Sequence, residues 1–248
     1  RYVLNTFMDK HAQILKWYDN YELHKVFHTL HNLCVNELSA FYLDILKDRL
    51  YVSGQDSPER RSAQTALFHI LLMLVQDMAP ILSFTAEEVY QHLPGNIRDS
   101  SPSVFGFSRS IIQKTPVSDD EKALWDMICL VRQEVTKAIE PKRKQGIVGH
   151  SLDVSLALYL EDGLYRKMNE VASSLREIFI LSQVTVLPSH QAPEEVYVSE
   201  AIPGLSIGIS PAAGQKCPRC WVFSEALDKA DPNQVCPRCS AVLEELQA

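Results

Sequence analysis

Residues 22–51 read ELHKVFHTLHNLCVNELSAFYLDILKDRLY, without a proline or glycine. Apolar residues recur there at spacings of three and four, which predicts one helix with a wide apolar stripe. The stripe comprises Leu23, Val26, Phe27, Leu30, Leu33, Cys34, Leu38, Phe41, Tyr42, Ile45, Leu46 and Leu50. Such a helix would be about 45 Å long. Because a helix of this kind is not stable alone in water, we expect other helices to cover the stripe.

Three neighbouring stretches also have helical spacing. Residues 1–18 carry Val3, Leu4, Phe7, Ile14, Leu15 and Tyr18 on one face. A further helix is predicted to begin after Ser57 as N-cap, with Pro58 in the first turn, and to end before Pro80. Its expected buried face consists of Ala63, Ala66, Leu67, Ile70, Leu71, Leu74, Val75 and Met78.

The last of these helices is predicted to begin at Thr85. Thr85 and Glu88 have the spacing of a capping box, and Phe84 is placed to contact Val89 as a hydrophobic staple. Four helices with short links predict an antiparallel helical bundle over residues 1–115. The fold class is therefore mainly α.

The spacing changes beyond the bundle. Residues 96–115 are rich in serine and look irregular, after which Ser118 is placed to cap another helix that kinks or ends near Pro141. Val154–Leu160 alternates like a strand, residues 164–179 return to helical spacing, and short strands are expected at 184–186, 196–198 and 205–209. We therefore predict a small α+β unit over residues 116–210 and a separate ribbon over 211–248.

Composition limits the class of protein. The chain has 248 residues, 46% of them hydrophobic, and a net charge of −7, which is typical of a globular protein rather than of a generally basic nucleic-acid binder. The longest apolar run is too short to span a bilayer. No secretory signal opens the chain and its first residue is not methionine, so we expect a fragment of a larger protein.

The last segment contains two paired cysteines, Cys217-Pro-Arg-Cys220 and Cys236-Pro-Arg-Cys239. Two such knuckles fifteen residues apart match a tetrahedral Zn²⁺ site with four thiolate ligands. Four ligands leave no open position, so we expect one structural zinc ion. The alternative, a redox dithiol, lacks the expected βαβ context. The remaining cysteines, Cys34 and Cys129, are expected to be inert core thiols.

Several basic and aromatic residues are candidates for nucleic-acid contact. Trp221 beside Arg219 on a rigid ribbon would form a platform for an unpaired base, although Trp221 could instead pack against the ribbon. Two further basic clusters are candidates for contact with phosphates. Runs of charged residues are, however, usually just solvated surface. The first cluster consists of Lys47, Arg49, Tyr51, Arg60 and Arg61, and the second consists of Lys142, Arg143 and Lys144. No Ser–His–Asp set, P-loop or GxGxxG is present, so no catalytic residue is predicted.

Five stretches together carry a resemblance. DNYELHKVFHTLHNLCVNELSAFYLDILKDRLY, ERRSAQTAL and APILSFTAEEVYQHLPG resemble the anticodon-binding helical domain of isoleucyl-tRNA synthetases. EPKRKQGIVGHSLD and the ending KCPRCW…VCPRC resemble the junction region and zinc ribbon of the same family, in its bacterial or organellar form. The resemblance covers nearly the whole chain in order. It implies a class I enzyme that joins isoleucine to its tRNA with ATP.

The sequence lacks several features of that family, and these differences limit the function expected of this chain. The ATP-binding signatures HIGH and KMSKS are absent, and Lys167-Met168-Asn169 is not the second of them. The editing domain has no counterpart. The resemblance therefore implies an inactive fragment that holds tRNA(Ile) by its anticodon stem-loop, with ATP bound only in a missing catalytic domain. We expect a monomer that works with the catalytic and editing domains in cis, in the bacterial cytoplasm or an organellar matrix.

Two other hypotheses remain open. Similar four-cysteine ribbons close some DNA-repair glycosylases, so the chain could be a nucleic-acid module of that class. The other hypothesis, the third in all, is that the chain is a zinc-stabilised helical adaptor that binds other proteins. Binding to tRNA rather than duplex DNA would separate the first two hypotheses, and absence of nucleic-acid binding would favour the third.

Overall fold

The computed structural model describes residues 1–95, 98, 101–107, 115–228, 230–231 and 233–246. The chain forms two compact units. One contains residues 1–46 and 55–118, and the other contains residues 47–54 and 119–248. The second unit thus includes a short segment from the first quarter of the chain. The division into parts 1–115, 116–210 and 211–248 stays a prediction.

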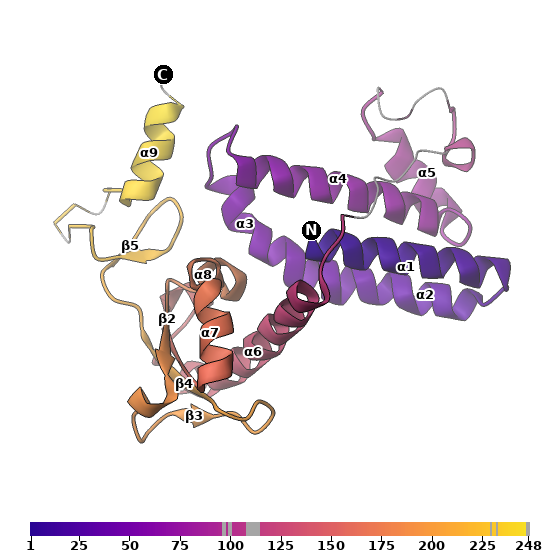
Figure 1. The fold of residues 1–248 in the computed structure, drawn as a ribbon. Coiled ribbons are helices and arrows are strands. Elements are labelled where there is room, and N and C mark those ends of the chain that lie inside the picture. The colour runs from indigo at the N-terminus through magenta and orange to yellow at the C-terminus, as the bar shows by residue number, and fades with distance from the viewer. Residues whose placement is uncertain (96–97, 99–100, 108–114, 229, 232, 247–248) are drawn as a thin grey trace. The chain divides into compact units, whose positions relative to one another are not determined.

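The first unit is built from helices (Figure 1). α1 (Tyr2–Asp19) and α2 (Leu23–Asn32) form a hairpin, because only three residues separate them. α4 (Pro58–Met78) packs against both, and α5 (Ser83–Gln91) packs against α4. The predicted helical bundle is confirmed.

Two clusters of buried apolar side chains hold this unit together. The cluster between α1, α2 and α4 contains Leu4, Phe7, Ile14, Val26, Leu30, Leu33, Ile70, Met73 and Leu74. The cluster between α4, α5 and the 3-10 turn η2 (Val104–Gly106) contains Leu72, Val75, Ala79, Ala86, Tyr90, Leu93, Val104 and Phe107. Since α4 serves both clusters, it buries two faces. The prediction of one face is therefore wrong at Leu71, which is exposed.

Residues 22–51 are helical, but they do not form a single α-helix. The π-helix η1 (Leu33–Tyr42) lies between α2 and α3 (Leu43–Tyr51). A π-helix has more residues per turn than an α-helix, so it changes which side chains share a face. The predicted stripe is also wider than the face that α1 and α4 cover. Leu23 and Phe27 were expected in the core, yet 54% of Phe27 is exposed.

The helix starts confirm one predicted cap and contradict another. Ser57 caps α4, because its hydroxyl accepts a hydrogen bond from the Arg60 N–H at 3.3 Å, and Pro58 is in the first turn. α5 begins at Ser83 rather than Thr85, without a side-chain cap. Phe84 is 93% exposed, so it forms no staple with Val89. The predicted capping box of Thr85 and Glu88 is therefore wrong, because the helix already begins before Thr85.

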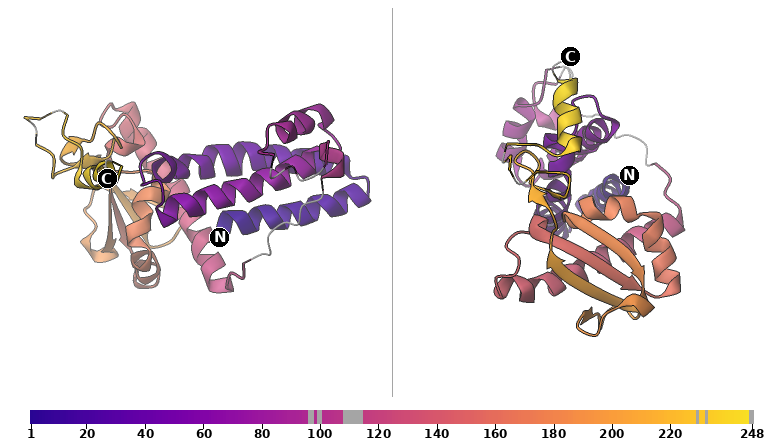
Figure 2. Two further views of the ribbon diagram at one scale, coloured as in Figure 1. Left: turned by 90° about the horizontal axis from the view of Figure 1, so that it is seen from above. Right: turned by 90° about the vertical axis from the view of Figure 1, so that its left-hand side faces the viewer.

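The second unit contains a four-stranded sheet with helices (Figure 2). Its elements in chain order are α6 (Asp119–Lys144), η3 (Ser151–Asp153), β1 (Val154–Leu160), α7 (Asp162–Glu170), α8 (Ala172–Phe179), β2 (Gln183–Pro188), η4 (Ser189–Gln191), β3 (Tyr197–Val198) and β4 (Leu205–Pro211). The strand order is β2-β1-β4-β3, with β1 parallel to β2 and antiparallel to β4. The α+β prediction is confirmed.

The register explains the alternating sequence of β1. Leu156 lies opposite Ile209, and Leu158 lies opposite Ile207, so apolar residues gather on one face of the sheet. α7 and α8 connect β1 to β2 and pack beside them, while α6 contacts β4. Leu156, Leu158 and Leu160 are buried as a result.

α6 continues through Pro141 and ends at Lys144. The helix was predicted to kink or end near Pro141, and it ends three residues later, because a proline near the last turn removes only one hydrogen bond there. Lys142, Arg143 and Lys144 consequently form the last turn of α6 rather than a following loop. Basic side chains in this position interact favourably with the negative end of the helix dipole.

The end of the chain forms a two-stranded ribbon and a helix. β5 (Gln215–Lys216) pairs with β6 (Phe223–Ser224), and α9 (Pro237–Glu245) follows. α9 was not predicted, since the segment read as a loop-rich ribbon. Within the described ranges, no helix is both long and apolar enough to cross a membrane.

Candidate metal centre and basic surfaces

The four paired cysteines meet at one point. The Sγ atoms of Cys217, Cys220, Cys236 and Cys239 all lie within 4.8 Å of one another, and all four residues are buried. The first knuckle lies between β5 and β6, and the second opens α9, where Pro237 occupies the first turn. All six cysteines of the chain are free thiols. The cluster can hold a metal ion.

Backbone N–H groups point at the cluster and stabilise negative charge on it. Although burial raises the pKa of Cys217, N–H groups of Cys220, Cys236 and Arg219 outweigh this and lower the pKa to about 6. The N–H of Cys236 lies 3.4 Å from the Cys217 sulfur. Burial raises the pKa of Cys239 to about 12. These two shifts favour a thiolate at Cys217 and a protonated thiol at Cys239.

A small apolar core surrounds the sulfurs. Val52 and Leu227 are buried with the four cysteines, and Val222 and Val235 pack against them. Val52 comes from the turn after α3, far from the knuckles in sequence. The turn after α3 therefore belongs to the apolar surroundings of the metal centre. The sequence alone did not indicate this contact.

The arginine in each knuckle is held inside this unit. Arg219 Nη1 donates to the Val52 carbonyl oxygen at 2.9 Å. Arg238 makes two hydrogen bonds to the Asp48 carboxylate, at 2.6 and 2.8 Å. Sequence reasoning proposed Arg219 as an RNA contact and overlooked Asp48, whose spacing carries no recognisable signal.

Trp221 is mostly exposed, although its ring lies beside Lys216 of the ribbon strand β5. Its side chain is 62% exposed, and the Lys216 ammonium lies 5.9 Å from its ring centroid. Its backbone is left-handed, with φ of +66°. A bulky residue is unfavourable in that region, so the tight knuckle imposes this conformation on Trp221. An exposed aromatic face beside an ammonium group can receive a flat, anionic partner such as a nucleotide.

The other candidate residues divide between the two units. Arg49 is paired with the Glu177 carboxylate, and one of its hydrogen bonds measures 2.9 Å. Tyr51, in the same unit, is 77% exposed. Arg60 and Arg61 are in the first turn of α4 in the bundle, where Arg61 is exposed and Arg60 is half-buried.

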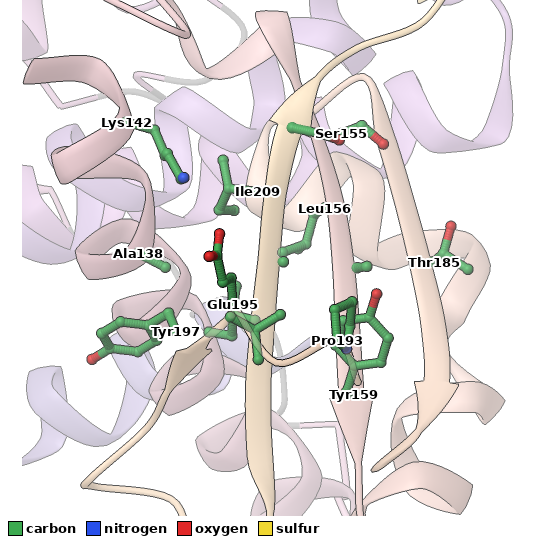
Figure 3. Close-up of a pocket in the computed structure, with 15 residues that line it drawn as sticks. Ala138, Lys142, Ser155, Leu156, Tyr159, Thr185, Pro193, Glu195, Tyr197 and Ile209 are labelled. Carbon is green, nitrogen blue, oxygen red and sulfur yellow. The ribbon is translucent and has the colours of Figure 1, made fainter. Parts of the chain in front are cut away.

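Lys142, in the last turn of α6, lines a groove on the sheet (Figure 3). The groove has a volume of about 470 Å³, and Lys142, Tyr159, Glu195 and Tyr197 are among its lining residues. Arg143 pairs with Glu140 and donates to the Gly149 carbonyl oxygen at 3.1 Å. Lys144 is exposed.

Known proteins resemble the chain along its whole length. Residues 1–158 match the family described as the anticodon-binding domain of tRNA ligase. The isoleucine–tRNA ligase of Nitratidesulfovibrio vulgaris (strain Miyazaki F) is 52% identical over 245 residues, which are 98% of this chain and 26% of that protein.

Two further isoleucine–tRNA ligases extend the comparison. That of Desulfovibrio desulfuricans is 44% identical over 250 residues, covering 100% of this chain and 26% of the relative. That of Carboxydothermus hydrogenoformans is 40% identical over 238 residues, covering 95% and 25%. The chain thus spans about a quarter of the length of the curated relatives that it matches.

Proposed function

Since the chain belongs to the family of anticodon-binding domains of tRNA ligases, we propose that it is the tRNA-binding part of an isoleucine–tRNA ligase. The observation that carries this proposal is identity of up to 52% with such ligases over nearly the whole chain. In the whole protein, the ATP-dependent joining of isoleucine to tRNA(Ile) takes place outside this chain. The chain binds tRNA at the anticodon stem-loop, as a monomer in the bacterial cytoplasm.

Zn²⁺ is the ion proposed for the four-cysteine cluster. Four thiolates at about 2.3 Å from zinc place neighbouring sulfurs about 3.8 Å apart in a tetrahedron. The Cys220 and Cys236 sulfurs are 3.7 Å apart, which fits that geometry. Cys217, Cys220, Cys236 and Cys239 would all be ligands, leaving no position for a substrate. The ion supplies folding free energy, and the chain's own residues bind the RNA.

Exposed and half-buried side chains are the proposed tRNA contacts. Unpaired bases of a loop are recognised by stacking on aromatic rings, for which Trp221 and Tyr51 are available. Phosphates would be contacted by Arg60, Arg61, Lys142, Arg143 and Lys144. Because Arg49 and Arg219 bind Glu177 and Val52, we propose that these two arginines mainly position the aromatic residues near them.

The test is binding of fluorescently labelled tRNA(Ile) to the zinc-loaded chain at several salt concentrations. We expect affinity that falls steeply with salt, because phosphate contacts release counterions. Arg60→Ala/Arg61→Ala should weaken binding without unfolding the bundle, whereas Arg166→Ala, which replaces an exposed residue of α7, is the control. Equal affinity for a tRNA with another anticodon would contradict anticodon recognition. Stronger binding to duplex DNA would favour the glycosylase-like alternative, and no nucleic-acid binding would favour the adaptor.

A further inference from the structure

The arginine in each Cys-Pro-Arg-Cys knuckle interacts with a cysteine of the other knuckle. Arg219 of the first knuckle donates to the Sγ of Cys239 in the second, at 3.4 Å. Arg238 of the second knuckle lies close enough to the Cys220 sulfur of the first for the guanidinium and the sulfur to interact electrostatically. Each guanidinium therefore ties one knuckle to the other. Sequence spacing does not predict this exchange, because both arginines occupy the same place within identical Cys-Pro-Arg-Cys motifs.

The same two arginines also hold the end of α3. Arg219 donates to the Val52 carbonyl oxygen, and Arg238 donates to both oxygens of Asp48. Val52 is 7% exposed and packs among the cysteines. We call residues 48–54 the α3 tail. Three contacts therefore hold the α3 tail in the metal centre. They are the ion pair of Asp48 with Arg238, the hydrogen bond from Arg219 to the Val52 carbonyl oxygen, and the buried Val52 side chain.

We propose that Arg219 and Arg238 are positioning residues that couple metal loading of the four-cysteine cluster to docking of the α3 tail. One Zn²⁺ with four thiolates carries a net charge of −2, which the two guanidinium groups partly offset, since Arg238 also pairs with Asp48. Their interactions with charged sulfurs are stronger than those with neutral thiols. Metal loading therefore holds both arginines in the orientation that also binds Asp48 and Val52.

The guanidinium group is required for this double role. It is planar and carries five N–H donors, so one edge can bind a carboxylate with two bonds while another N–H reaches a sulfur. A lysine ammonium keeps the charge but lacks the two-edged fork. Arg238→Lys consequently tests the geometry separately from the charge.

Coupling of this kind acts in both directions. If metal binding favours docking of the tail, then loss of the tail's anchor lowers metal affinity by the same factor. Outer-shell partners of metal ligands typically change metal affinity by about 10- to 100-fold when they are replaced. We therefore expect Asp48→Asn, which removes a charge that touches no cysteine, to weaken metal binding measurably.

The test measures Zn²⁺ affinity of the full chain by competition with a chromogenic chelator, together with amide hydrogen exchange. Asp48→Asn and Arg238→Lys should each weaken Zn²⁺ binding by about 10- to 100-fold. The matched control Arg166→Lys replaces an exposed arginine of α7 in the same unit. Removal of Zn²⁺ from the unaltered chain should speed exchange of the Val52 and Ser53 amides, which both bond to the Asp48 carbonyl oxygen.

The outcomes are separable. Affinities of both variants equal to that of Arg166→Lys, or unchanged exchange of the tail after Zn²⁺ removal, would overturn the coupling. Failure of the unaltered chain to bind Zn²⁺ would overturn the metal assignment instead, and the coupling with it. Neither result bears on tRNA binding. Slow exchange of the Leu156 and Leu158 amides, in the buried strand β1 of the second unit, verifies that the variants fold.

Discussion

Trp221 combines a strained backbone with an exposed ring. A non-glycine residue in the left-handed region costs roughly 1–2 kcal/mol, and an exposed tryptophan recovers little of that by burial. The knuckle turn that brings Cys217 and Cys220 together requires this conformation, and glycine would adopt it more easily. A tryptophan at such a position has a use other than stability, which supports its proposed role in base stacking.

Trp221→Gly should separate stability from binding. Relief of backbone strain should stabilise the zinc-loaded ribbon by about 1 kcal/mol, while loss of the ring should weaken tRNA binding by about 1–3 kcal/mol. Thermal unfolding and fluorescence anisotropy measure the two effects. Trp221→Phe is the control that retains a stacking face. A glycine variant that binds tRNA as tightly as the parent would remove Trp221 from the interface.

Glu134 is a buried carboxylate on α6 with three partners. Hydrogen bonding by Lys137, at 2.6 Å, and then by Ser199 lowers its pKa, although burial acts in the opposite direction. Because the folded pKa is below the unfolded value of about 4.3, the stabilisation is complete above that pH. It is lost as the pH falls from about 4.3 through the lowered folded value.

Glu134→Gln should therefore destabilise the second unit at pH 7 by about 1–3 kcal/mol, since the charged hydrogen bonds to Lys137, Tyr197 and Ser199 are weakened. The difference from the parent should shrink below about pH 4. Urea unfolding at pH 7, 5 and 3.5 measures it. Parallel stability curves for the two proteins over that range would contradict the assigned role of Glu134.

Elements differ in how they obtain their stability. α1, α2 and α4 bury a shared apolar cluster, so they support one another without a metal. β5, β6 and α9 are short, and the buried residues around them are mainly the four cysteines with Val52 and Leu227. Such a segment lacks enough apolar surface to fold alone, and a metal can replace the missing core.

Cys239→Ser should consequently unfold the ribbon but not the bundle. Removal of one thiolate opens the metal site to water, and the region from Lys216 to α9 should lose its slow-exchanging amides. Amide exchange read by mass spectrometry distinguishes the two regions. The control is Cys34→Ser, which replaces a half-buried thiol in the first unit. Retention of protection around Cys217 in the Cys239 variant would show that the ribbon needs no metal.

The whole molecule contains two compact units with different tasks in the proposed function. The first carries Arg60 and Arg61, whereas the second carries the metal centre, Trp221 and the basic end of α6. The segment 47–54 belongs to the second unit although the chain continues from it into α4. A division by sequence position alone does not anticipate such an exchange, because contacts between distant residues define a compact unit.

In the proposed full-length ligase, chelation of Zn²⁺ should lower tRNA charging much more than adenylate formation. The reason is that the ribbon is a proposed RNA contact, while activation of isoleucine needs groups positioned at the ATP phosphates elsewhere in the proposed full-length protein. Aminoacylation and isoleucine-dependent ATP–pyrophosphate exchange measure the two steps before and after chelation. Readdition of Zn²⁺ is the control. An equal loss of both activities would contradict a role confined to tRNA.

The sequence by itself determined the features that arise from local chemistry. Helical spacing identified the helices of the bundle, alternation identified β1, and the Ser57-Pro58 pair identified the start of α4. The two Cys-Pro-Arg-Cys motifs predicted a cluster of four sulfurs, because each knuckle brings its own pair of cysteines together. These features depend on residues a few positions apart, where backbone geometry limits the possibilities.

Only the tertiary structure decided which of these residues are buried and with which partners they interact. Phe27 fits the apolar stripe but is exposed, because the helices packed against α2 cover a narrower face. Arg238 pairs with Asp48, which lies 190 residues earlier in the chain. The Arg219 guanidinium binds inside the unit at the Val52 carbonyl oxygen, whereas the Trp221 side chain is exposed. Such pairings depend on how the chain closes over long separations, and no periodicity in the sequence records them.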